Sequence, residues 1–442
     1  MRRHGICLVV VLLLACVPVT SVHAQPADAL RRELEMLREQ MAAATQAYER
    51  RLKELSDRLE QLEVGRVPDP PPAAATPPAA ALPPAAAPSD MDLARPRQPF
   101  ALAAPGSSLL FDIGVSGDFV ADFTSGRRER QREGTLAGRE NRLFPREVTL
   151  SSFGRVDPYA SAVVRISAGE EADSRDLAVR LDEANVSLLT LPLGTTARFG
   201  LMRPRFGTLN VVHQDDLPQV DRPNVLTRFF GEEQLDGERG VEAFWTLPLS
   251  TYHELSVGVF DGDNETAFGR GSLRDPLVIG RWRTFFELEE LGGLQLDLSA
   301  ASGVTADDRR NTVVGFGAKY KWMGSGTGFP VLTLAGEALA GFRHVDDDAT
   351  GHHVSRWGAY LYAQYNVDRR WAAGLRGDWT ELPIARGREW ALSPYVQFKP
   401  SEFLRFRLQY KHTEGTGLVE RVADEIFLQG SFVLGAHPTE RF

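Results

Sequence analysis

Pairs of cationic side chains two residues apart recur in the second half of the chain. The pairs are Arg281/Arg283, Lys319/Lys321 and Arg405/Arg407. Residues two apart on a β-strand share one face, with their side chains about 7 Å apart. Two such cations form a positive strip that an anion can follow while it sheds part of its hydration shell, and the arginine fork suits two oxygens of a phosphate or carboxylate. These residues therefore predict anion binding.

The segments that carry these pairs alternate between apolar and polar residues. In the clearest segment, apolar Leu404, Phe406, Leu408 and Tyr410 are interleaved with Arg405, Arg407, Gln409 and Lys411. A period of two predicts a β-strand with one apolar and one polar face. Sixteen strands are expected, over residues 109–123, 145–156, 159–169, 177–191, 195–203, 239–248, 251–261, 277–289, 292–303, 311–322, 330–345, 353–367, 370–381, 389–399, 402–413 and 423–436.

The apolar faces are too numerous to share one soluble core, and the polar faces carry Arg and Lys. This combination predicts an all-β fold, a 16-stranded antiparallel transmembrane β-barrel whose polar faces line a lumen. Short turns alternate with longer polar loops, and all seven tryptophans fall in this region, most of them near strand ends on the outward face. Both features are typical of bacterial outer-membrane barrels. A pair of soluble β-sandwiches is the alternative.

The inward faces of the expected strands give a lumen of mixed charge. Arg155 and Arg165 lie on them, as do the acids Asp112, Asp118, Asp182, Asp297, Glu337 and Asp378. The residues expected to bind anions are Arg198, Arg203, Arg205, Arg281, Arg283, Lys319, Lys321, Arg376, Arg405, Arg407 and Lys411. The alternative is that these cations pair with lumenal acids and only fill the wall.

The longest loop, residues 204–238, is rich in Pro, Phe and charged residues of both signs. A long ordered loop in a compact domain is usually functional, and a sixteen-stranded barrel without an insertion is a wide aqueous channel. We therefore expect this loop to fold inward and narrow the lumen, with Arg203 and Arg205 at its root. Alternatively, the loop caps the outer mouth or packs in an oligomer interface.

Residues 1–24 have the composition of a secretory signal. Arg2 and Arg3 precede an apolar stretch, and Ala24 ends a small-residue cleavage site. Both cysteines of the chain, Cys7 and Cys16, lie in this segment, so disulfides and cysteine nucleophiles are not expected after cleavage. The alternative is a lipoprotein signal that leaves Cys16 lipidated.

Two further regions precede the barrel domain, which is expected over residues 107–442. Residues 28–64 show heptad spacing of leucines with charges of both signs on the other faces, which predicts a coiled-coil stalk for oligomerisation. A lone solvated helix is the alternative. Residues 67–106 are almost entirely Pro and Ala, which predicts an extended, semi-rigid linker.

Several functional classes are disfavoured. The formal net charge of −9 argues against nucleic-acid binding, which needs a basic surface. The glycine run at 324–328 lacks the lysine and the helix of a phosphate-binding loop. The acidic stretches 261–265 and 346–348, the second followed by His352 and His353, are weak candidates for cation binding. We expect no catalytic residues, metal or cofactor.

The order of parts resembles the phosphate-selective porin O/P family of Gram-negative outer membranes. The residues that carry the likeness are Arg198 to Gly207, the loop through Arg222-Pro223, and the C-terminal stretch from Phe427 through Phe432 and Gly435 to Phe442. The resemblance implies a trimeric, sixteen-stranded channel with cations that guide anions inward, a role carried over to Arg198, Arg203 and Arg205. Pro438 and the many lumenal acids depart from that pattern.

The leading hypothesis is an outer-membrane porin, a non-enzyme that lets small anions, phosphate or others, diffuse passively. Its expected partners are outer-membrane lipid, two further copies of the chain in a homotrimer, and the cell wall through a periplasmic stalk. A structural outer-membrane anchor tethered by that stalk is the second hypothesis, and a hydrolase embedded in the barrel is the third.

Overall fold

The computed structural model describes residues 111–125, 141–170, 176–231, 234–264, 266–324, 328–345, 352–418 and 421–435. The expected signal, stalk and linker lie outside these residues, as does the C-terminal end after residue 435.

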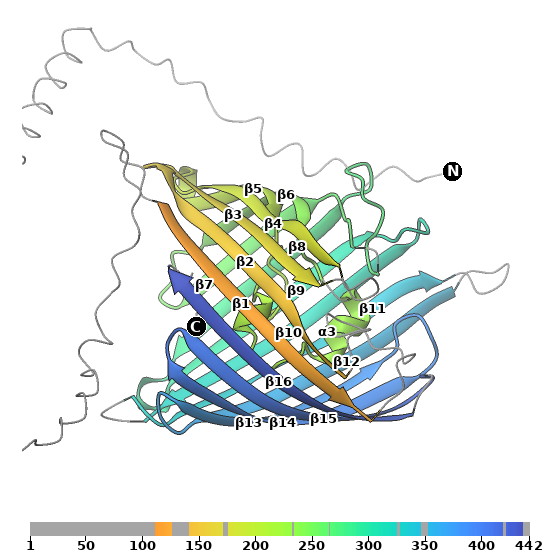
Figure 1. The fold of residues 1–442 in the computed structure, drawn as a ribbon. Helices are drawn as coiled ribbons and strands as arrows, with labels where there is room; N and C mark the ends of the chain where they lie inside the picture. The colour runs from red at the N-terminus through yellow and green to blue at the C-terminus, as the bar shows by residue number, and fades with distance from the viewer. Residues whose placement is uncertain are drawn as a thin grey trace, which may run out of the picture. The chain divides into compact units, whose positions relative to one another are not determined.

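Sixteen antiparallel strands form a closed barrel, in which each strand pairs with its neighbours in the chain and β1 pairs with β16 (Figure 1). The first eight are β1 (Phe111–Thr124), β2 (Arg142–Asp157), β3 (Ala160–Glu170), β4 (Leu177–Leu188), β5 (Thr195–Met202), β6 (Glu238–Thr246), β7 (Tyr252–Phe260) and β8 (Leu277–Glu287). The second eight are β9 (Gly293–Val304), β10 (Arg310–Met323), β11 (Val331–Val345), β12 (His352–Asn366), β13 (Trp371–Glu381), β14 (Arg388–Ser401), β15 (Leu404–Thr416) and β16 (Val422–Gly435).

The predicted fold class is confirmed, and the expected strand ends differ from the observed ones by at most three residues. The alternation of apolar and polar residues determines whether a side chain faces the outside of the barrel or the lumen. On β15, Phe406 and Leu408 are 46% and 51% exposed on the outer face, whereas Arg407 and Gln409 are 3% and 0% exposed on the inner face. Large exposed apolar residues recur on the outer face of the other strands. Such a surface is stable only against lipid.

The tryptophans lie on the outward phase of their strands. Trp245, Trp282, Trp357, Trp371 and Trp390 are all exposed. Trp357 and Trp379 contact each other across β12 and β13, with ring centroids 4.0 Å apart. All seven tryptophans belong to the strands from β6 to β14. This distribution fits an interfacial girdle on that part of the wall.

The two ends of the barrel differ. Short connections join β2 to β3 and β14 to β15, whereas 35 residues separate Met202 at the end of β5 from Glu238 at the start of β6. β1 begins and β16 ends at the end with the short turns, because Phe111 pairs with Gly154 and Gly435 pairs with Gly114.

In the part of the chain that the structure describes, no helix is both long and apolar enough to cross a membrane.

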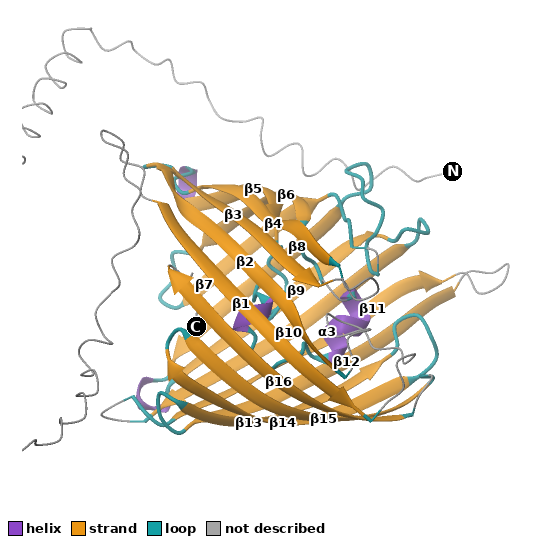
Figure 2. Cartoon of the chain, in the orientation of Figure 1, coloured by secondary structure: helices purple, strands orange, loops and turns teal. Residues whose placement is uncertain are grey.

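The segment between β5 and β6 lies inside the barrel. It contains a short 3-10 helix, η2 (Gln214–Asp216), and one α-helix, α3 (Asn224–Phe230), which Figure 2 shows within the ring of strands. We call residues 203–237 the lumenal loop. Its apolar side chains pack against inward-facing residues of β8 to β12, so a hydrophobic core fills part of the lumen.

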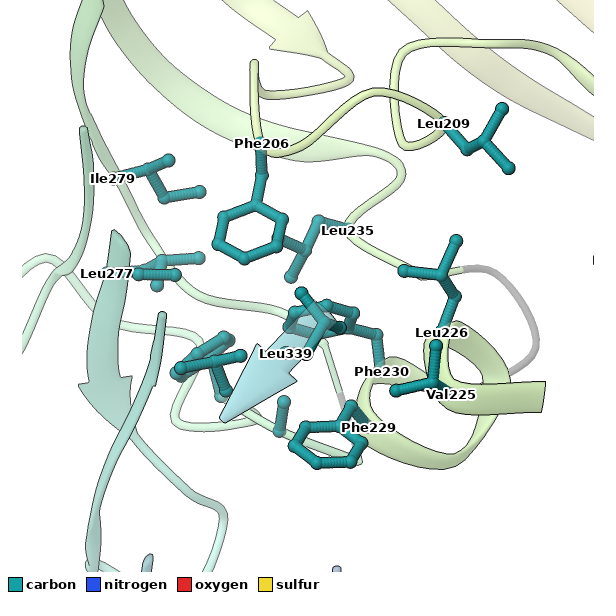
Figure 3. Packing of buried hydrophobic residues seen from close by; sticks show 14 of the residues in the cluster. Phe206, Leu209, Val225, Leu226, Phe229, Phe230, Leu235, Leu277, Ile279 and Leu339 are labelled. Atoms are coloured by element: carbon teal, nitrogen blue, oxygen red, sulfur yellow. The ribbon is translucent and has the colours of Figure 1, made fainter. Parts of the chain in front are cut away.

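Phenylalanines form the centre of this core (Figure 3). Phe206 and Phe230 are each 1% exposed and pack edge to face, with ring centroids 5.2 Å apart. Leu277 and Ile279 of β8 and Leu339 of β11 cover them from the wall. The loop is therefore held by packing as well as by polar bonds.

We expect Phe230→Ala to loosen the lumenal loop, because removing a buried phenylalanine costs about 3–5 kcal/mol. Trypsin should then cleave within residues 203–237 faster than in the unaltered protein, while the barrel stays folded. The control is Phe406→Ala, which removes the same side chain from the outer face. Equal cleavage rates in both variants would show that the core does not hold the loop.

Candidate functional site

A cavity of about 960 Å³ lies between the lumenal loop and the end of the barrel with the short turns. Lys399, Asn366 and Phe285 line it, and each lies within two residues of the end of its strand at a short turn. Loop residues close the opposite side, among them Val211, Val212 and Pro218. The cavity therefore occupies the half of the lumen nearest the short turns.

Positive charge dominates the lining of this cavity. The lining includes eleven cations, Arg165, Arg198, Arg203, Arg205, Arg281, Arg283, Lys319, Lys321, Lys399, Arg405 and Arg407, against three carboxylates, Glu183, Asp216 and Glu254. Nine of the eleven residues predicted to bind anions are in this set. Seven of them lie on the inward faces of β5, β8, β10 and β15, and the other two, Arg203 and Arg205, belong to the start of the lumenal loop.

Arg376 and Lys411 are the two predicted residues that do not line the cavity. Both bind Asp221 of the lumenal loop. Arg376 Nη2 lies 2.9 Å from each carboxylate oxygen, and Lys411 Nζ lies 2.7 Å from Oδ2. Arg376 is completely buried and also bonds Asp378. We correct their assignment: these side chains anchor the loop, and their donors are taken up by it rather than offered to a diffusing anion.

The charge of Asp221 is essential to this anchor. Burial alone would raise the pKa of its carboxyl group, but the charges of Arg376 and Lys411 and their hydrogen bonds outweigh burial and hold it well below the ordinary value of 3.8. A carboxyl group with a lowered pKa stabilises the folded state above its ordinary pKa and loses that contribution as the pH falls through the lowered value. The anchor therefore persists into acidic solution.

Other polar contacts tie the loop to the inner wall on several sides. Thr208 N donates to Glu337 Oε1 of β11 at 2.6 Å, and Gly207 N donates to Ser299 of β9 at 2.9 Å. On the side of β14, Arg228 Nη2 lies 2.8 Å from Glu389 Oε2. These contacts and the hydrophobic core agree with the expectation that the loop folds inward, and they do not fit a loop that only caps the outer mouth.

Carboxylates of the wall balance several of the lining cations. Arg198 pairs with Glu242 at 2.6 Å, and Arg283 pairs with Asp297 at 2.6 Å. Glu254 receives both Arg205 and Arg281, at 2.7 and 2.8 Å. Arg203 pairs with Asp236 of the loop. These five arginines are therefore paired with acids inside the barrel, as the alternative prediction for the lumenal cations stated.

Some residues of the site were missed by sequence reasoning. Lys399 is the last residue of the expected strand 389–399 and was not among the predicted anion-binding residues, but β14 continues to Ser401 and Lys399 lines the cavity. Glu254 follows the inward phase of β7 and was identifiable from alternation alone. His213 of the loop bonds Glu183 at 2.9 Å, and burial, aided by nearby Arg203, lowers its pKa. No pattern in the sequence signals that contact.

In the described part of the acidic loop after β7, two aspartates are occupied by ion pairs. Asp261 and Asp263 both pair with Arg239. Within the described ranges, no group of three or more His, Cys, Asp or Glu side chains is arranged to hold a metal ion. Residues 346–348 of the second acidic stretch lie outside those ranges.

Comparison with known proteins reveals the same architecture elsewhere. An anion-selective porin from Comamonas acidovorans superposes with a TM-score of 0.51 at 10% identity, covering 74% of this chain and all of that one. The outer membrane channel DcaP of Acinetobacter baumannii gives a TM-score of 0.51 at 10% identity, covering 74% of this chain and 97% of that one. The fold is that of a porin barrel.

The sequence comparisons do not identify a family. No family model matches the chain. An uncharacterised protein from Aquifex aeolicus (strain VF5) is 26% identical over 333 residues, which cover 66% of this chain and 68% of that protein. Of what the resemblance to phosphate-selective porins implies, the comparisons support the porin barrel.

We expect Asp221→Asn to release the loop of this porin barrel, since breaking a buried ion pair costs about 3–5 kcal/mol. Single-channel conductance should increase. In the unaltered protein conductance should stay constant from pH 7 down to about pH 4 and rise only at lower pH, as Asp221 is protonated. Asp263→Asn, which removes an exposed loop charge, is the control. If both variants conduct alike, Asp221 does not set the loop position.

Proposed function

We propose that the protein is an outer-membrane porin through which small anions diffuse passively. The observation that carries the proposal is the cavity lining, with eleven cations against three carboxylates in the half of the lumen next to the short turns. Lumenal cations lower the electrostatic cost of anion entry, and pore-lining charge sets the selectivity whatever the net charge of the chain. Inorganic phosphate is one of the anions we propose, together with other small anions.

The lumenal loop sets the size limit in this proposal. Because the loop is fixed in position, a solute has to pass beside it. The channel therefore selects solutes by size as well as by charge. No covalent step is involved, and the protein has no catalytic role. The short turns face the periplasm, because this is the usual orientation of bacterial barrels, and the N-terminal stalk then lies in the periplasm.

Planar-bilayer recordings of the purified protein in asymmetric KCl test the channel proposal. We expect a conducting channel whose reversal potential shows preference for chloride over potassium, because the cavity carries excess positive charge. A cation-selective channel would overturn the role given to the lining cations. A barrel that does not conduct would support the second function, a structural anchor of the outer membrane, which the stalk and linker composition favours.

The stalk is proposed to assemble three copies of the chain. Deletion of residues 26–66 should then leave conductance per barrel unchanged while the trimer dissociates, since the barrel contributes the whole lumen and the heptads contribute the association. Chemical crosslinking and light scattering of the purified variant measure this. Trimers that survive the deletion would refute the assembly role and leave the stalk as a tether.

A further inference from the structure

Two lining arginines differ from the rest in having no acidic partner. Arg405 and Arg407 lie two residues apart on the inner face of β15 and both line the cavity. Across the described parts of the chain, no carboxylate oxygen lies within ion-pair distance of either guanidinium. Of the predicted cation pairs, Arg281/Arg283 is balanced by the wall, whereas this pair is not.

The contacts of Arg407 are all with neutral oxygens. Its Nε donates to Gln397 Oε1 at 3.0 Å, and its Nη1 donates to Gln429 Oε1 at 3.0 Å and to the carbonyl oxygen of Gln219 at 3.2 Å. These bonds fix the orientation of the guanidinium without cancelling its charge. Among the described residues, Nη2 of Arg407 has no hydrogen-bond partner.

Arg405 has still fewer contacts. Its Nε atom is buried and has no hydrogen-bond partner. Two like charges side by side, with unused donors, repel each other in a partly dehydrated site. An oxyanion between them would remove that repulsion and satisfy the donors, because charged hydrogen bonds of this kind are about twice as strong as neutral ones.

Apolar surface lies in the same cavity. Leu209, Val211, Val212 and Pro218 of the lumenal loop line it, with Ala335 of the wall. The lumenal loop also contacts the arginine pair, since the carbonyl oxygen of Gln219, next to Pro218, accepts a hydrogen bond from Arg407. A hydrated inorganic ion gains nothing from apolar contacts, whereas an organic anion buries its hydrocarbon body there.

We propose that Arg405 and Arg407 form the selectivity-determining subsite of the pore, and that it takes organic carboxylates with an apolar body. The inference rests on the proposed porin function and specifies its solute class. The carboxylate lies at the unused donors of the arginine pair, and the apolar body contacts the loop residues that line the cavity. The balanced arginines then contribute to the general potential rather than to recognition.

Block of the chloride current tests the subsite. Benzoate serves as the probe for an organic carboxylate and inorganic phosphate as the probe without an apolar body, each added to the full-length protein in a bilayer. We expect half-block at a lower concentration for benzoate than for phosphate. In R405Q/R407Q the half-blocking concentration of benzoate should rise at least about tenfold, which corresponds to about 1.4 kcal/mol.

The matched control is R281Q/R283Q, which removes the same charge from the balanced pair in the same cavity. The rise in half-blocking concentration should be clearly smaller there. R405K/R407K should keep anion selectivity but weaken benzoate block, because an ammonium lacks the planar fork. If the double variants fail to fold, Arg405→Gln keeps the test, since that side chain makes no bond in the described barrel.

The outcomes separate the two proposals. A non-conducting or cation-selective unaltered protein would overturn the porin function itself. An anion-selective protein in which both glutamine variants lose benzoate block equally would overturn only the subsite. Block by phosphate at or below the benzoate concentration would overturn the preference for an apolar body.

Discussion

Closure of the hydrogen-bonded ladder is the constraint on which the rest of the structure depends. A strand edge inside a bilayer would leave backbone N–H and C=O groups without partners, at a cost of several kcal/mol each. The pairing of β1 with β16 removes both edges. Once the ring is closed, every strand has one face toward lipid and one toward the lumen, and the alternation of side chains follows from that division.

The second constraint is the width of the lumen, part of which the lumenal loop fills. Sixteen strands enclose more space than their own side chains fill. Phe206 and Phe230 give the interior a packed core like that of a soluble domain, and Asp221 adds a charged anchor to β13 and β15. The loop is thus an internal domain in miniature, and the open space left beside it is the basic cavity.

Much of this architecture could be predicted from the sequence, because a period of two is a local signal. The strand positions and the inward phase of Arg281 or Arg407 follow from neighbouring residues alone. The pairing of charges does not. Arg205 meets Arg281 at Glu254 only because the lumenal loop folds against the paired strands β7 and β8.

The anchoring role of Arg376 shows the same limit. No residue near Arg376 in the sequence indicates that Asp221 is its partner. Asp221 lies 155 residues away and contacts Arg376 because the loop folds into the barrel. Alternation assigned Arg376 and Arg405 to the same lumen with equal weight, whereas their partners separate a structural cation from an unbalanced one. Sequence patterns therefore place charges on the correct face but do not reveal what neutralises them.

The position of the cavity along the barrel axis has a consequence for transport. The basic lining lies on the short-turn side of the loop, and the hydrophobic core around Phe230 lies on the other. An ion that enters from the short turns meets attractive charge first, whereas an ion from the opposite mouth meets the barrier first. In the proposed channel, such a profile makes the current depend on the sign of the voltage, so we expect the barrel to pass ions more easily in one direction.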